Sequence, residues 1–298
     1  MQKIWKRIFY PPAKINLTLE VVGKRADGYH LLRTVMLKLP KLRDRLVLMI
    51  SSVSKMEIIL KSNQKSIPLD EKNTCYRATQ LFLEKINQKA KVEITLTKKI
   101  PFGAGLGGGS SDAAMTLLGL SQFFRKSLSK EQLISLASDV GKDVPFFLEE
   151  KEAALMTGLG DKREKSWSFK ERFFVLVVKP PENVSTALAY GGLAEKMWFL
   201  KKKQRFNWSA SLANKSVQKK SEIILSNSLY NDFEITIERQ LPIIKEIKQS
   251  LLAFGAEGAL MSGSGSTVFG IFSSLPKLER VQKIFKKHYS NFFVARGR

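Results

Sequence analysis

Residues 101–109 constrain the fold more than any other part of the chain, because five of these nine positions are glycine. Glycine at that density breaks helices and strands, so the segment is expected to be a loop. Ser110 and Ser111 follow it directly, and a helix-forming run extends to about residue 120. Backbone N–H groups clustered in front of a helix bind phosphate, since the helix dipole adds partial positive charge there. The segment therefore predicts a phosphate-binding loop rather than a flexible linker.

Two widespread phosphate loops do not fit this segment. Gly103, Gly105 and Gly108 satisfy the dinucleotide-binding pattern, but that pattern requires an acidic residue about twenty positions further on. Residues 123–126 read Phe-Phe-Arg-Lys instead. A Walker loop requires a lysine followed by Ser or Thr after its last glycine, and no lysine stands there. The signatures of protein kinases are missing as well.

Hydrophobic periodicity predicts an α+β fold, and its first half contains both strands and helices. The expected strands are residues 15–21, 31–39, 45–50, 56–60 and 92–97, and the expected helices are 74–86, 110–120 and 130–140. Apolar and polar residues alternate in the first of these strands. That pattern predicts one buried face, with Asn16, Thr18 and Glu20 on the opposite face.

The second half reads as a separate unit after a change in composition near residue 160. We expect strands at residues 173–178, 259–261, 268–272 and 292–295, and helices at 187–200, 242–254 and 276–288. The order strand, helix, strand, strand, helix, strand is typical of the ferredoxin-like fold, here with one extra helix before the second strand. We therefore divide the chain into an N-terminal domain of residues 1–165 and a C-terminal domain of residues 166–298.

The chain is strongly basic, with 50 Lys and Arg against 27 Asp and Glu and a net charge of +23. Such an excess favours a nucleic-acid partner, and an RNA-binding protein is the alternative from another functional class. Eight of the basic residues, however, lie in the unpatterned segment 196–222, and the rest are spread along the chain. No basic and aromatic signature of RNA binding is present. We expect mostly solvated surface charge and no nucleic-acid partner.

Cysteine and histidine are too few for a disulfide or for a zinc centre made of them, since the chain has only Cys75, His30 and His288. No stretch approaches the ~20 apolar residues of a membrane-spanning helix. We expect a soluble, cytoplasmic protein without a membrane partner.

Three separated segments resemble the motifs of the GHMP kinase superfamily, which phosphorylates hydroxyl groups of small molecules with ATP. They are Pro-Ala-Lys-Ile-Asn-Leu at 12–17, the glycine loop, and Met-Ser-Gly-Ser-Gly-Ser at 261–266. Further segments resemble one branch of the superfamily, which acts on a cytidine diphosphate ester of methylerythritol. They are Arg-Ala-Asp-Gly-Tyr-His at 25–30, Gly-Lys-Asp-Val-Pro at 141–145 and Asn-Asp-Phe-Glu at 231–234. The resemblance extends from about residue 11 to residue 295.

The resemblance implies a ribosomal-S5-like N-terminal domain that binds ATP and a ferredoxin-like C-terminal domain, with the substrate between them. It implies ATP and Mg²⁺ as cofactors and phosphorylation of the ester's 2-hydroxyl in non-mevalonate isoprenoid biosynthesis. The expected partner is this small molecule, and the expected state is a monomer or weak homodimer. A sister enzyme acting on homoserine or mevalonate is the alternative, against which residues 25–30 argue.

The resemblance also implies roles for individual residues. Lys14 and Asp143 match the catalytic pair: Lys14 orients the hydroxyl and keeps Asp143 ionised, and Asp143 accepts the hydroxyl proton. Lys99 is the other lysine expected near the chemistry. The expected ATP contacts are Pro101, Gly103, Ala104, Gly105, Leu106, Gly107, Gly108, Gly109, Ser110 and Ser111.

The expected substrate contacts are Asn16, Tyr29, His30, Asp143, Gly263, Ser264 and Gly265. Tyr29 and His30 would contact the cytosine, and the glycine turn would close over the transferring phosphate. Asn16 either contacts substrate or only satisfies a neighbouring backbone group. Ser111 is the candidate metal ligand. No role is carried onto residues 196–222.

Overall fold

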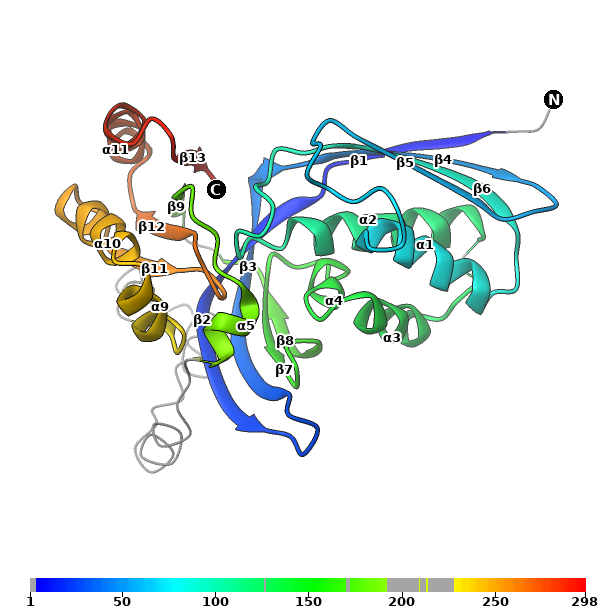
Figure 1. Ribbon diagram of the computed structural model, residues 1–298, viewed down its shortest axis with the longest axis horizontal. Helices are drawn as coiled ribbons and strands as arrows, with labels where there is room; N and C mark the ends of the chain where they lie inside the picture. The colour runs from blue at the N-terminus through cyan, green and yellow to red at the C-terminus, as the bar shows by residue number, and fades with distance from the viewer. Residues whose placement is uncertain (1–3, 126, 170–171, 192–208, 210–212, 214–227) are drawn as a thin grey trace. The chain divides into compact units, whose positions relative to one another are not determined.

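A computed structural model describes residues 4–125, 127–169, 172–191, 209, 213 and 228–298 (Figure 1). The predicted helical residues 192–200 and most of the basic segment 196–222 lie outside the described residues. Contacts group the chain into two compact units that interleave along the sequence. Unit 1 comprises residues 1–13, 43–102 and 107–150, and unit 2 comprises residues 14–42, 103–106 and 151–298. The division at residues 165 and 166 stays a prediction.

Unit 1 is built on a four-stranded sheet in the order β1-β4-β6-β5. Its strands are β1 (Trp5–Phe9), β4 (Arg45–Ser52), β5 (Glu57–Ser62) and β6 (Ala90–Thr97). β4 pairs antiparallel with β1 and β6, and β5 pairs parallel with β6. Alternation along β4 buries Leu46, Leu48 and Ile50 completely.

Helices cover one face of this sheet in two layers: the first two contact the strands, and the last two pack against those helices (Figure 1). They are α1 (Thr74–Lys85), α2 (Gly108–Phe123), α3 (Lys130–Val140) and α4 (Val144–Phe147). α2 approaches β4 closely at Gly119, where an added Cβ would stand 2.4 Å from Leu48 Cδ2. This contact packs α2, the helix that follows the glycine loop, tightly against the sheet.

The first sheet of unit 2 has the order β10-β2-β3-β7-β8. Its strands are β2 (Pro12–Lys24), β3 (His30–Arg43), β7 (Ala153–Thr157), β8 (Lys162–Trp167) and β10 (Tyr230–Asn231). The expected half-buried character of β2 is wrong. Asn16, Thr18 and Glu20 are at most 3% exposed, because hydrogen bonds tie this face to the protein, among them Thr18 Oγ1 to Ser209 Oγ at 2.7 Å.

The second sheet of unit 2 confirms the predicted ferredoxin-like arrangement. Its strands are β9 (Phe174–Lys179), β11 (Gly258–Met261), β12 (Val268–Phe272) and β13 (Phe293–Arg296), in the antiparallel order β11-β12-β9-β13. Its helices are α5 (Thr186–Gly191), α9 (Glu234–Gln240), α10 (Ile243–Ala253) and α11 (Leu275–His288). The first and last strands lie side by side, as this fold requires.

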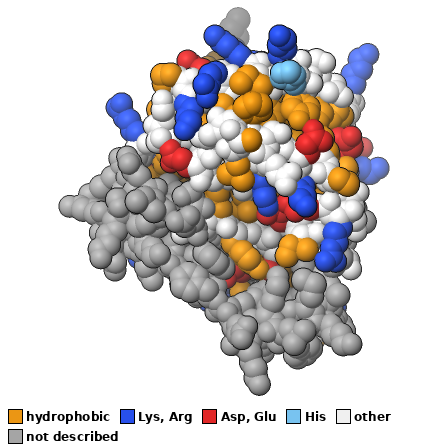
Figure 2. All heavy atoms as spheres, turned by 90° about the vertical axis from the view of Figure 1, so that its left-hand side faces the viewer, with side chains coloured by type: hydrophobic (Ala, Val, Ile, Leu, Met, Phe, Trp, Pro, Cys, Tyr) orange, Lys and Arg blue, Asp and Glu red, His pale blue; other side chains and the backbone are white. Residues whose placement is uncertain are grey.

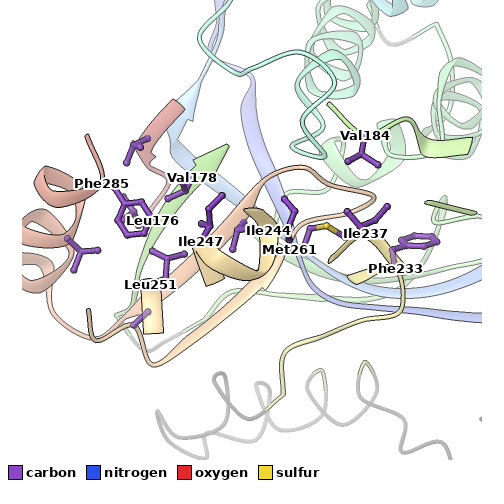
Figure 3. Close-up of a cluster of buried hydrophobic side chains, with 14 of the residues drawn as sticks. Leu176, Val178, Val184, Phe233, Ile237, Ile244, Ile247, Leu251, Met261 and Phe285 are labelled. Carbon is purple, nitrogen blue, oxygen red and sulfur yellow. The ribbon is translucent and has the colours of Figure 1, made fainter. Parts of the chain in front are cut away.

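A buried cluster joins these helices to the sheet (Figure 3). Phe233 and Ile237 extend it at one end, Ile247 of α10 lies in its middle, and Leu176 and Phe285 lie at the other end. Burial of side chains of this size contributes about 1.5–3 kcal/mol each, so the cluster anchors α9 and the turn before it firmly. That turn bears directly on the candidate site.

Among the side chains described on the face drawn in Figure 2, Lys and Arg form no single basic patch. Lys and Arg side chains stand mostly apart there, with acidic and apolar side chains between them. No helix within the described ranges is long and apolar enough to cross a bilayer.

Candidate active site

The glycine loop has the backbone expected of a phosphate cradle. Gly103, Gly105 and Gly107 have φ values of +65°, +72° and +68°, a left-handed conformation that favours glycine. α2 begins at Gly108, two residues earlier than predicted, with Gly107 as its N-cap. Because Gly107 has no side chain to cap the helix, the first N–H groups of α2 are available to a ligand.

The two serines after the loop differ in their surroundings. Ser110 is half-buried, whereas Ser111 is fully buried, and its hydroxyl has no hydrogen-bond partner among the residues described. A buried hydroxyl without a partner costs free energy, which a phosphate or cation contact would offset. The donor chemistry of Ser111 thus fits its expected role as a ligand. Among the described residues, no group of three His, Cys, Asp or Glu side chains is placed to hold a metal ion.

A buried charge cluster lies beside the start of α2, and sequence reasoning missed it. Lys98 Nζ donates to Asp44 Oδ2 and, at 2.5 Å, to Asp112 Oδ2, and the three side chains are at most 4% exposed. Burial raises the pKa of Asp112 to about 7, since attraction to Lys98 offsets only part of that effect and Asp44 adds repulsion. Lys99, the lysine expected near the chemistry, has an exposed side chain.

Asp143 lies at the corner before α4. Its backbone is helical, at φ −85° and ψ −11°, and its carboxylate does not cap the helix. The corner also lies near the start of α2, because a Cβ added to Gly141 would stand 4.0 Å from Ser110 Oγ. The half-buried carboxylate of Asp143 is therefore carried by the same unit as the serines of the loop.

Lys14 lies in unit 2, on β2, with only 4% of its surface exposed. Its Nζ donates to Asn16 Oδ1 at 2.8 Å, and its backbone N–H donates to the carbonyl of Leu106 at 2.9 Å. Asn16 in turn donates from Nδ2 to Thr34 Oγ1 at 2.8 Å. The side chain of Asn16 thus positions the lysine, and Thr34, which sequence reasoning missed, positions Asn16.

The turn after β11 meets both β2 and the glycine loop. Ser262 Oγ accepts from the backbone N–H of Asn16 at 3.3 Å and donates to the carbonyl of Gly105 at 3.1 Å. The chains approach so closely that a Cβ added to Gly105 would stand 2.4 Å from the Ser262 carbonyl oxygen. Gly263 also lies beside Asn16 and Gly105. Unit 2 therefore brings together parts of the three motifs that are far apart in the sequence.

Asn231 holds this turn in place. Its Nδ2 donates to the carbonyls of Met261 and Gly263, both at 2.8 Å. Glu234 Oε1 accepts from the backbone N–H of Met261 at 2.9 Å, and Asp232 Oδ2 accepts from that of Val21 at 2.7 Å. The motif at 231–234 was noticed in the sequence, but nothing in its composition indicated which backbone groups it would bind.

The expected cytosine contacts lie at the start of β3. The ring of His30 stacks on that of Tyr190, with centroids 4.9 Å apart and an interplanar angle of 25°. Burial lowers the pKa of His30 from 6.5, and the charge of Lys24 lowers it further, so the imidazole is neutral at pH 7. The side chain of Tyr29 is 61% exposed. Tyr190 had no signal in the sequence.

Comparison with known proteins shows which family the chain resembles. Residues 73–151 match the family GHMP kinases N terminal domain, and residues 210–291 match GHMP kinases C terminal. A 4-diphosphocytidyl-2-C-methyl-D-erythritol kinase of Clostridium novyi (strain NT) is 38% identical over 284 residues, covering 95% of this chain and 97% of that protein.

Solved structures give the same result. A crystal structure of 4-(cytidine 5'-diphospho)-2C-methyl-D-erythritol kinase superposes with a TM-score of 0.76 at 31% identity, covering 97% of this chain and 98% of that one. A homoserine kinase from Cytophaga hutchinsonii has a TM-score of 0.77 over 100% and 95% of the two chains, but its 18% identity shows only a shared fold. The chain therefore belongs to the 4-diphosphocytidyl-2-C-methyl-D-erythritol kinase family within the GHMP kinases, and it is a kinase.

Proposed function

We propose that this kinase transfers the γ-phosphate of ATP to the 2-hydroxyl of 4-diphosphocytidyl-2-C-methyl-D-erythritol, a step of non-mevalonate isoprenoid biosynthesis. The observation that carries the proposal is the meeting of Lys14 and Asn16 with Gly105 and Ser262 in unit 2. A buried ammonium beside two glycine turns suits a reaction in which negative charge moves between phosphate oxygens.

ATP would be held by the glycine loop, from Pro101 to Ser111. The left-handed glycines and the start of α2 offer backbone N–H groups, which recognise phosphate oxygens without requiring a side chain. Ser111 would hold Mg²⁺, with its buried hydroxyl as the ligand. When bound, the ion would neutralise charge on the phosphates.

Lys14 and Asp143 would act on the acceptor hydroxyl. The Lys14 ammonium is oriented by Asn16, so it is preorganised to donate to an oxygen and needs no rearrangement in the transition state. Asp143 would accept the hydroxyl proton on its carboxylate as the bond to phosphorus forms. The substrate would lie against the turn formed by Gly263, Ser264 and Gly265. Asn231 would keep this turn in position through its hydrogen bond to the Gly263 carbonyl.

The cytosine would bind at Tyr29 and His30. The stacked pair His30 and Tyr190 offers a flat aromatic surface, and a neutral imidazole has one nitrogen that donates and one that accepts. That combination matches the edge of a pyrimidine base.

We further propose a cytoplasmic enzyme, a monomer or weak homodimer, with domains at residues 1–165 and 166–298.

ADP release with four acceptors tests the proposed reaction. The cytidine diphosphate ester should support turnover, and the same polyol phosphate without cytidine should be poor. Homoserine and mevalonate should support none. Turnover of either of these two in place of the ester would overturn the proposal, and equal turnover with and without cytidine would remove His30 and Tyr29 from the substrate site.

A further inference from the structure

The buried charge cluster beside α2 contacts both ends of the glycine loop. Asp44 occupies the single position between β3 and β4 and is fully buried. Its Oδ1 accepts from the backbone N–H groups of Lys99 and Ile100, at 2.5 and 2.9 Å, immediately before the loop. Its Oδ2 accepts from Lys98 Nζ. One carboxylate therefore fixes the point at which the chain enters the loop.

The same lysine reaches the far end of the loop. Lys98 Nζ donates to Asp112 in the first turns of α2, and a Cβ added to Gly108 would stand 3.3 Å from that nitrogen. The two sides of the loop at residues 101–107 are thus joined through one ammonium group. Charge-assisted hydrogen bonds of this kind are about twice as strong as neutral ones, and removing one partner of a buried set is costly.

We propose that Asp44 and Lys98 are positioning residues for the nucleotide: they set the span of the glycine loop, so that its N–H groups are prearranged for the phosphates of ATP. This inference rests on the proposed use of ATP and adds residues that do not themselves touch the ligand. A loop whose two ends are fixed loses less conformational entropy when it binds phosphate.

The arrangement also predicts the direction in which nucleotide affinity changes when one carboxylate is removed. That direction distinguishes positioning of the loop from a purely electrostatic effect. Two carboxylates share one ammonium beside a loop for a polyanion. If these groups acted only through their charge, removal of one carboxylate charge would tighten nucleotide binding. If they position the loop, the same change weakens nucleotide binding, because an amide NH2 in place of Oδ2 cannot accept from Lys98, and the link between the two ends of the loop is lost.

The test compares Asp44→Asn with wild type in the full-length protein. The substitution leaves Lys98 and Asp112 as a balanced pair, so the variant should fold, which thermal melting monitors. We expect the KM for ATP, and the Kd for ADP and for a non-hydrolysable ATP analogue measured by calorimetry, to rise about tenfold, the loss of a charge-assisted hydrogen bond. The KM for the cytidine ester should stay unchanged. A merely structural role would not raise the KM for ATP while leaving that for the ester unchanged.

Lys91→Met serves as the matched control. Lys91 lies on β6, the strand that Lys98 directly follows. Its ion pairs with Glu57 and Glu93, however, are 3.6 Å long and partly exposed. This variant should bind nucleotide like wild type. Lys98→Met and the double variant complete a cycle in which the two effects should be far from additive, since both residues act through one anchor.

Two results would overturn the inference while leaving the proposed function intact. One is unchanged or tighter nucleotide binding by folded Asp44→Asn. The other needs no variant: rapid hydrogen exchange at the amides of Lys99 and Ile100 in nucleotide-free wild type would show that the loop entry is not anchored. Wild type that binds neither ADP nor the analogue would instead reject the proposed function, and the inference with it.

Discussion

The backbone N–H of Asn16 donates to the hydroxyl of Ser262, which lies 246 positions later in the chain. The same hydroxyl donates a hydrogen bond to the carbonyl of Gly105. A single hydroxyl thus connects the strand that carries Lys14 with two glycine turns. Because the hydroxyl both accepts and donates, the three segments are held at fixed distances from one another, and the predictions below address the parts of this assembly.

Gly105→Ala should destabilise the protein more than Gly103→Ala. Both glycines have positive φ, so each alanine loses about 1 kcal/mol to the left-handed conformation. At Gly105 the added Cβ also meets the Ser262 carbonyl, whereas nothing lies within 4 Å of a Cβ at Gly103. Urea unfolding should show a loss of about 3 kcal/mol at Gly105 and about 1 kcal/mol at Gly103. Equal losses would mean that the turns are not in close contact.

Asp143→Asn should retain nucleotide binding and lose turnover by about a thousandfold, because an amide cannot accept the hydroxyl proton. Calorimetry with ADP and a coupled ADP-release assay measure the two effects separately. Asp139→Asn is the control, since Asp139 is exposed on α3 and has no proposed role. Retained turnover in Asp143→Asn would remove this residue from the chemistry.

The KM for the cytidine ester should depend on pH through His30. Because burial and Lys24 lower the pKa of His30, the neutral form persists at pH 7 and is lost at a lower pH than in an ordinary histidine. We expect a constant KM for the ester from about pH 7 to 8 and a rise below about pH 6, with no such rise for ATP. In His30→Phe the pH dependence should vanish. A wild-type KM for the ester that stays flat down to about pH 5 would contradict a contact with His30.

Asn231→Asp should destabilise the turn at residues 261–263. The amide donates to two carbonyls, and a carboxylate of the same shape would face them with no proton to give. Burial of this mismatch should lower the free energy of unfolding by about 3 kcal/mol and reduce kcat. The exposed Asn87 provides the control, because Asn87→Asp changes charge equally at the surface. Similar stability of the two variants would show that Asn231 is not a required donor.

Elements with a clear period could be predicted from the sequence, and elements stabilised by their neighbours could not. The helices α1, α3 and α11 follow their apolar spacing closely. β8 reads Lys-Arg-Glu-Lys-Ser-Trp, which has no strand alternation, and β10 is two residues long. Both exist because an adjacent strand supplies hydrogen-bond partners.

The candidate site divides in the same way. Lys14, Asp143 and the glycine loop lie in recognisable local motifs, so their positions could be read directly. Asp44 and Tyr190 carry no local pattern, because their importance comes from groups distant in sequence. β2 was expected to be half-buried for a related reason: alternation reports which residues share a face, not what covers the opposite face.

The spacing of side chains in the segment 231–234 sets which backbone groups each of them binds. Asn231 reaches the turn at Gly263, Asp232 reaches Val21, and Glu234 reaches Met261. A single inserted or deleted residue would exchange these partners all at once, placing carboxylates opposite carbonyls and leaving the N–H group of Val21 without its acceptor. The length of this segment is therefore as important to the turn as the identity of its side chains.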